Sequence, residues 1–219
     1  MPTPELITVN ESLMDDTRQK KLRLLVSKLN KERKKQAKQI DILCNDLIAA
    51  QRDFIEKLKT ISFTANFYEA IVGTTDLSSL FYTAGKLIKE EIPDANIAFF
   101  LRQEDNFELH LFESDQPITL EKQRPENYFT SEWVDNICKL NKICTLEDMF
   151  AMGLNLVSLN KISAVTIPLG QFGPSLGFIL IYRSSENKLT PDELNNISAV
   201  TGGLSRAIQA RQVLLHSAD

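Results

Sequence analysis

The stretch ISAVTIPLGQFGPSLGFILIYRSSENKLTPDEL, residues 162–194, decides the class of fold. It contains two apolar runs of strand length, Ile162–Leu169 and Leu176–Tyr182, which are separated by a turn rich in glycine and proline. A helix start follows, because Thr190 can cap a first turn and Pro191 suits the first helical position. The stretch therefore predicts a β-hairpin that leads into a helix, and helical spacing of apolar residues continues almost to the end of the chain.

The preceding residues alternate in the same way between helices and strands. In chain order they predict helical segments within 67–92, a hairpin of strands 95–102 and 107–112, a helix capped at Thr130 or Ser131, a short strand 143–145, and a loop with a partial helical turn at 146–156. The order is helix, hairpin, helix, strand, hairpin, helix. It is typical of an α+β domain in which an antiparallel sheet is flanked by helices.

Residues 16–61 contain neither proline nor glycine and are rich in helix-forming residues. Most heptad a and d positions are apolar, which predicts a coiled coil between two copies of the chain. From Leu22 onward these positions are Leu22, Val26, Leu29, Arg33, Gln36, Ile40, Leu43, Leu47, Ala50 and Phe54. We expect the coil to be looser around Arg33 and Gln36, because polar residues at such positions lower stability.

The predicted organisation has four parts. It consists of a disordered tail (1–15), a coiled-coil helix (16–61), an α+β domain (62–212) that follows a short break around 62–66, and a C-terminal tail (213–219). No apolar run is long enough to cross a bilayer, and residues 1–10 lack the pattern of a secretory signal. The three cysteines form no CxxC pair, which fits a reducing compartment. We therefore expect a cytoplasmic protein without a membrane association.

Charge is distributed unevenly along the chain. The formal net charge is −4, yet residues 18–38 contain ten basic residues and one acidic residue, a segment of +9, so the rest of the chain carries −13. Such a run usually forms a solvated helix face. The alternative is a binding site for an acidic protein or nucleic acid, of which nucleic acid is not favoured.

Residues 165–209, from VTIPL through LGFILIY to LTPDELNNISAVTGGLSRAIQ, resemble the closing third of a GAF domain. Residues 77–112 and 130–148 are similar to the opening and middle of that family, so the resemblance covers about 62–212. It implies a GAF-like antiparallel sheet of about six strands, with helices on one side and a small-molecule pocket on the other. It also implies a non-catalytic sensory homodimer that signals through its helices, with the two coiled-coil helices parallel and with Leu204 and Ile208 of the last helix in the dimer interface. No output domain is recognisable, so the signal is expected to pass to a partner protein in trans.

The family's architecture places the pocket between the sheet and the middle helix and loop. By that resemblance the expected ligand-binding residues are Phe100, Arg102, Phe129, Trp133, Ile137, Phe150 and Met152. Arg102 is the only cation among them and suits a carboxylate or phosphate. The sequence identifies neither the ligand nor a cofactor, and it predicts no catalytic group and no metal site, since the two histidines lack metal-ligand spacing.

Two alternatives to a sensory module remain open. One is a structural adaptor whose basic coiled coil binds an acidic partner. The other is a redox enzyme of the GAF fold, which would use Cys138 and Cys144 as nucleophilic and resolving thiols. A cyclic-nucleotide site is not expected: Asn187–Lys188 and Asp192–Glu193 are similar to the two ends of that family's pattern, but the spacing is compressed and the phenylalanine is missing.

Overall fold

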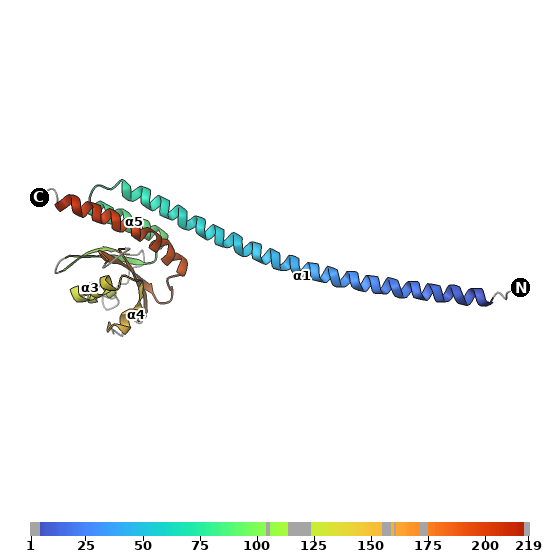
Figure 1. The fold of residues 1–219 in the computed structure, drawn as a ribbon. Helices are drawn as coiled ribbons and strands as arrows, with labels where there is room; N and C mark the ends of the chain where they lie inside the picture. The colour runs from blue at the N-terminus through green and yellow to red at the C-terminus, as the bar shows by residue number, and fades with distance from the viewer. Residues whose placement is uncertain are drawn as a thin grey trace. The chain divides into compact units, whose positions relative to one another are not determined.

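The computed structural model describes residues 5–103, 106–113, 124–154, 159, 161–170 and 175–216, and within these ranges the side chains from Thr17 to Val213. The chain divides into two compact units, the first unit (residues 1–55) and the second unit (residues 56–219). The first helix, α1 (Glu5–Val72), contributes to both (Figure 1). Every described side chain of the first unit is exposed, whereas the second unit holds all the buried residues of the described chain.

The boundaries of α1 differ from the prediction at both ends. The helix begins at Glu5, within the predicted disordered tail of 1–15, and it continues through the predicted break at 62–66 to Val72. The Thr64 hydroxyl donates at 2.7 Å to the carbonyl oxygen of Thr60, four residues earlier, so this polar residue is accommodated without ending the helix. The helix stops at the glycine that follows Val72, and the Thr74 hydroxyl donates to the Ile71 carbonyl at 2.7 Å.

The second unit is an α+β domain, as predicted. After α1 its elements are α2 (Leu77–Glu91), β1 (Asn96–Arg102), β2 (Phe107–Phe112), η2 (Pro125–Tyr128), α3 (Ser131–Leu140), β3 (Cys144–Thr145), α4 (Leu146–Ala151), β4 (Ile162–Pro168), β5 (Gly177–Ser184) and α5 (Pro191–His216). The strands form one antiparallel sheet in the order β2-β1-β5-β4-β3. The resemblance implied about six strands, and the described residues form five.

Side-chain caps explain where the helices of this domain begin. Asp76 accepts a hydrogen bond from Ser79 N at the start of α2, and Thr130 caps α3. Thr145 and Asp148 form a complete capping box at α4, a helix that lies within the loop predicted for 146–156. α5 begins at the predicted Pro191, but it runs to His216 and so includes part of the predicted tail 213–219.

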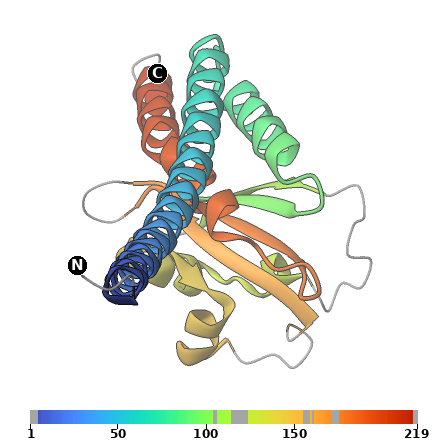
Figure 2. The same ribbon diagram turned by 90° about the vertical axis from the view of Figure 1, so that its right-hand side faces the viewer.

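Helices cover both faces of the sheet, not one face as the resemblance implied. Figures 1 and 2 show α2 and α5 on one face and α3 and α4 on the other. The first core lies under α2, α5 and the end of α1 and is mainly aliphatic: Phe67, Ile71, Leu80, Ile88, Ile97, Phe99, Val165, Ile179, Ile181, Val200, Leu204 and Ile208 are among its members. The second core lies under α3 and α4 and is rich in aromatic rings, with Phe100, Phe129, Ile137, Cys138, Met149, Phe178 and Tyr182 among its members.

Candidate functional site

The residues predicted to bind a ligand lie mostly on the α3–α4 face. Phe100 of β1 is fully buried at the centre of an aromatic group, with its ring centroid 4.8 Å from that of Phe178, 5.1 Å from that of Phe129 and 5.3 Å from that of Phe107. Phe129 and Ile137 are also buried in this core. These three predicted residues therefore meet in one place, where they pack against neighbouring side chains.

The other four predicted residues lie at the margin or outside. Trp133 and Phe150 are partly buried and pack against the second core. Arg102 forms an ion pair with Asp135 of α3, with 2.7 Å between Arg102 Nε and Asp135 Oδ1, and both side chains are partly exposed. Met152, which is 37% exposed, follows the end of α4. The structure thus brings five of the seven residues to one core and leaves Arg102 and Met152 at the surface.

A buried polar pair that the sequence did not reveal adjoins the second core. The Tyr182 hydroxyl donates to Glu126 Oε1 at 2.6 Å, and the Glu126 side chain is almost completely buried. Burial, together with this bond to a carboxylate, raises the pKa of Tyr182 far above its ordinary value. Arg124 lies 3.9 Å from Glu126 Oε1 and also pairs with Glu113. In the sequence, only the presence of a tyrosine in an apolar strand points to such a pair. A buried phenol hydroxyl needs a hydrogen-bond partner, but the sequence does not show which residue it is.

The two cysteines of the redox alternative are free and buried. Burial raises the pKa of both the Cys138 and Cys144 thiols, which disfavours the reactive thiolate. Cys44 is free and exposed in the first unit. Burial outweighs the opposite effect of the nearby cations, Arg102 at Cys138 and Lys142 at Cys144, on the pKa of each thiol.

The residues that resemble a cyclic-nucleotide pattern have structural partners. Glu193 accepts hydrogen bonds from both terminal nitrogens of the buried Arg183, at 2.8 and 3.0 Å, and from Thr190 at the start of α5. Asn187 donates to Asp94, which also binds Arg183. These contacts fix the loop between β5 and α5.

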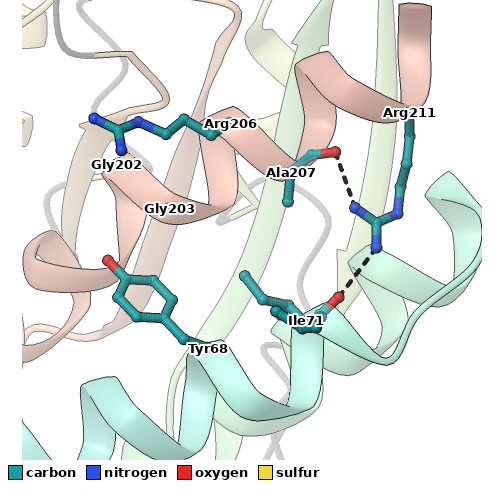
Figure 3. A pocket seen from close by; sticks show the side chains of 8 residues that line it. Tyr68, Ile71, Gly202, Gly203, Arg206, Ala207 and Arg211 are labelled. Atoms are coloured by element: carbon teal, nitrogen blue, oxygen red, sulfur yellow. Dashed lines mark hydrogen bonds between the residues drawn. The ribbon is translucent and has the colours of Figure 1, made fainter. Parts of the chain in front are cut away.

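The end of α1 meets α5 in a second candidate region, around a hollow of about 500 Å³ (Figure 3). The Tyr68 ring lies against Gly203, where an added Cβ would come within 2.2 Å of Tyr68 Cε1, and the Tyr68 hydroxyl donates to Ala199 O at 3.1 Å. Arg211 of α5 donates to the carbonyls of Ile71 and Thr74 at 3.1 and 2.6 Å and so caps the C-terminus of α1.

A third contact joins α1, α2 and α5. Thr60 donates to Asn196 Oδ1 at 2.6 Å, and Asn196 Nδ2 donates to Glu91 Oε1 at 2.6 Å. Asn196 is buried, so both polar ends of its amide are satisfied by elements that are distant in sequence. With Arg211, this contact fixes the last part of α1 to the rest of the second unit.

The residues predicted for the dimer interface fall into two groups. Those from Leu22 to Phe54 are all exposed, for example Leu43 at 67% and Phe54 at 62%. Leu204 and Ile208, in contrast, have no exposed surface, because they pack in the first core against α1 and α2. The prediction that these two residues contact a second chain is therefore wrong. The residues that α5 exposes in this part of the helix are Arg206, Gln209 and Ala210.

Within the ranges that the structure describes, no three His, Cys, Asp or Glu side chains come together as metal ligands would. None of the described helices is both long enough and apolar enough to cross a bilayer.

No protein-family model matches the sequence, and no curated protein matches it significantly. The structure is similar to solved GAF domains. The GAF domain of an Acinetobacter phosphoenolpyruvate-protein phosphotransferase superposes with a TM-score of 0.53 at 10% identity, covering 72% of this chain and 98% of that one. The corresponding domain from Coxiella burnetii gives 0.51 at 10% identity, covering 71% and 96%. The GAF domain of the cyanobacteriochrome TePixJ gives 0.50 at 14% identity, covering 65% and 95%. The chain therefore carries a GAF-like domain, which confirms the fold that the sequence resemblance implied.

Proposed function

We propose that this chain is a non-catalytic sensory module in which a GAF-like domain binds a small molecule. Two copies dimerise through a parallel coiled coil of α1, and the dimer signals through its helices to a partner protein in trans. The observation that carries the proposal is a GAF-like domain joined to a helix whose apolar a and d residues are exposed. Such a helix is stable in water when its apolar stripe is covered by a second helix.

Contacts inside the domain support the coupling between the core and the helices. Phe67 and Ile71 of α1 belong to the same core as the strand residues Val165 and Ile181, so a shift of the sheet reaches α1 directly. Arg211 ties α5 to the end of α1. A ligand that changes the packing of the sheet would therefore bias the two helices together.

We place the ligand on the α3–α4 face, where most of the predicted residues lie. Phe100 already contacts three other rings, so a ligand there must displace at least one of them. The Tyr182–Glu126 pair adjoins this core and offers a buried carboxylate for orienting a ligand. The expected contacts remain Phe100, Arg102, Phe129, Trp133, Ile137, Phe150 and Met152.

Native mass spectrometry of the full chain, purified without added ligand, tests the proposal. A dimer that carries an added small-molecule mass supports both of its parts. A bare dimer, even after incubation with a metabolite extract, contradicts ligand binding. A monomer at micromolar concentration contradicts the coiled coil.

A second candidate function rests on the charge of the first unit. Seven basic residues occupy heptad positions b, c and f, away from the apolar seam: Lys20, Lys21, Lys28, Lys31, Lys34, Lys35 and Lys38. All of them are exposed. In a dimer they would face outward and suit an acidic protein. If the chain is such an adaptor, it binds poly-glutamate in a salt-sensitive way. Replacing Lys28, Lys31, Lys35 and Lys38 together by glutamate should then abolish this binding and leave the dimer intact. Unchanged binding would contradict the adaptor function.

The redox alternative is the weakest, because both candidate thiols are buried with raised pKa values. Iodoacetamide should therefore modify Cys44 in the native chain much faster than Cys138 or Cys144. Rapid modification of Cys138 or Cys144 would restore this alternative.

A further inference from the structure

The carboxylate of Glu126 is buried with only one of its two oxygens paired. The side chain is 2% exposed. Its Oε1 accepts a hydrogen bond from the Tyr182 hydroxyl at 2.6 Å, whereas Oε2 is buried and has no hydrogen-bond partner among the described residues. Burying an acceptor without a hydrogen bond is unfavourable, and buried polar atoms are almost always paired. Oε2 is therefore a position for a donor that the described chain does not supply.

The polar neighbours of this carboxylate are already engaged. Tyr182 has a single hydroxyl proton, which it donates to Oε1, and burial raises the pKa of Tyr182 so that the phenol keeps this proton. Arg124 Nη1 lies 3.9 Å from Oε1, which is too long for a hydrogen bond, and Arg124 also pairs with Glu113. Two carboxylates thus share one guanidinium, and the excess of negative charge among these three groups favours a cation at Oε2.

Glu126 borders the aromatic part of the second core. It lies in η2, and Phe129 N donates to Glu126 O at 3.4 Å across the turn. Phe129 and Tyr182 both belong to the second core, and the ring centroid of Phe129 is 5.1 Å from that of Phe100. The carboxylate therefore lies beside residues that are expected to contact the ligand.

We propose that the ligand of the GAF-like domain is a small aromatic cation whose N–H group donates to Glu126 Oε2. The assignment rests on the proposed function, which places a ligand on the α3–α4 face, and it adds the chemical class of that ligand. An ammonium or amidinium group both donates a hydrogen bond and balances the negative charge. An aromatic body suits the rings of Phe100 and Phe129.

An anionic ligand fits these groups less well. Arg102, which suits a carboxylate or phosphate, is paired with Asp135 at 2.7 Å. An anion beside Glu126 would also meet a like charge in a buried place, where such repulsion is strong.

Isothermal titration calorimetry of the full chain with three probes of nearly equal size tests the charge preference. Benzamidinium carries a positive charge and N–H donors, benzamide is neutral, and benzoate is negative. We expect benzamidinium to bind at least about tenfold more tightly than either of the others. If benzamidinium does not bind below about 10 mM, or binds no more tightly than benzoate, the proposal is overturned, because water would then satisfy Oε2.

A conservative variant tests whether Glu126 makes the contact. Glu126→Gln keeps the size of the side chain and an acceptor for Tyr182, but it replaces the negative charge and the free oxygen by an amide NH2 group. It should weaken benzamidinium binding at least about tenfold. Glu132→Gln, at an exposed acid in the first turn of α3, is the control and should leave binding unchanged. Equal affinity of both variants would overturn the proposal, and the three probes test the wild type without any substitution.

Native mass spectrometry after incubation with a metabolite extract separates this proposal from the proposed function. A small-molecule mass that is present on the wild type and lost from Glu126→Gln supports both. The same mass retained in equal amount by Glu126→Gln would overturn the contact with Glu126 and leave ligand binding intact. A wild-type chain without any added mass would contradict both.

Discussion

The first and second units use apolar residues in opposite ways. Leu43 and Phe54 of the first unit are mostly exposed, while Phe100 and Leu204 of the second unit have no exposed surface. A domain that buries its own apolar residues is stable as a single chain, but a helix that exposes them needs a second chain. In the proposed function the first unit therefore provides assembly, while the second unit provides stability and binds the ligand.

The largest effect is expected when charges are placed at the apolar a and d positions of α1. Leu43→Asp combined with Leu47→Asp should raise the dissociation constant of the dimer by at least about 10⁴-fold, or about 5.5 kcal/mol, because each aspartate replaces a leucine at a core position of the coil. Sedimentation equilibrium measures this change. The control is Asn45→Asp, which lies between the two positions but on the outer face and should leave the dimer intact. If the double variant also remains a dimer, the apolar a and d positions do not form the interface.

Removing an aromatic ring from the second core should affect only the GAF-like domain. Phe100→Ala leaves a cavity among Phe107, Phe129 and Phe178, and we expect a loss of about 3–5 kcal/mol in the free energy of unfolding of the domain. Calorimetry that resolves the domain transition measures it, and the dimer should persist. Tyr82→Ala, at a ring that is 64% exposed, is the matched control and should change stability by less than about 1 kcal/mol.

The contact between α1 and α5 can be tested by a more specific substitution, with a smaller expected loss of stability. Gly203→Ala places a methyl group against the Tyr68 ring and should destabilise the domain by about 1–3 kcal/mol. Gly73→Ala, whose added Cβ would find its nearest neighbour at 3.7 Å, should be almost neutral. In the Tyr68→Ala background, Gly203→Ala should no longer lower the free energy of unfolding appreciably. Urea unfolding measures this, and an equal loss in both backgrounds would contradict the contact.

The smallest expected effect concerns the start of α4. Thr145 donates to Asp148 Oδ2 through its backbone N–H at 2.8 Å and its hydroxyl at 2.9 Å, and these bonds lower the pKa of Asp148. The resulting stabilisation is fully present above the unfolded pKa of about 3.9 and is lost as pH falls through the lower folded pKa. Thr145→Ala should therefore cost about 1 kcal/mol at neutral pH and reduce the loss of stability between about pH 4 and pH 2. Identical pH profiles of the variant and the wild type in urea unfolding would contradict this assignment.

Much of the fold could be predicted because its signals are local. The strand pattern located β2 at its observed residues, and Thr190–Pro191 marked the start of α5. The break predicted at 62–66 was wrong, because the Thr64 hydroxyl bonds within the helix. Helical periodicity alone does not distinguish a side chain that packs in its own domain from one that packs against a second chain, and for this reason Leu204 and Ile208 were misassigned.

The candidate site was less predictable, because it depends on contacts between distant residues. Phe100 and Phe129 meet only when β1 and the residue after η2 come together in the folded domain. Glu126 lies in a segment without apolar periodicity, and its partner Tyr182 is 56 residues away.

The bond from Arg211 to Ile71 has a consequence for how the protein is made. It joins residues 140 positions apart, and the last turn of α1 contains no basic residue of its own. During translation α1 therefore emerges long before the guanidinium that caps it. The contact can form only after Arg211 has left the ribosome, so we expect the domain to complete its folding after the coiled-coil segment has been synthesised. Pairing of two nascent α1 helices would thus precede the folding of the domains that they carry.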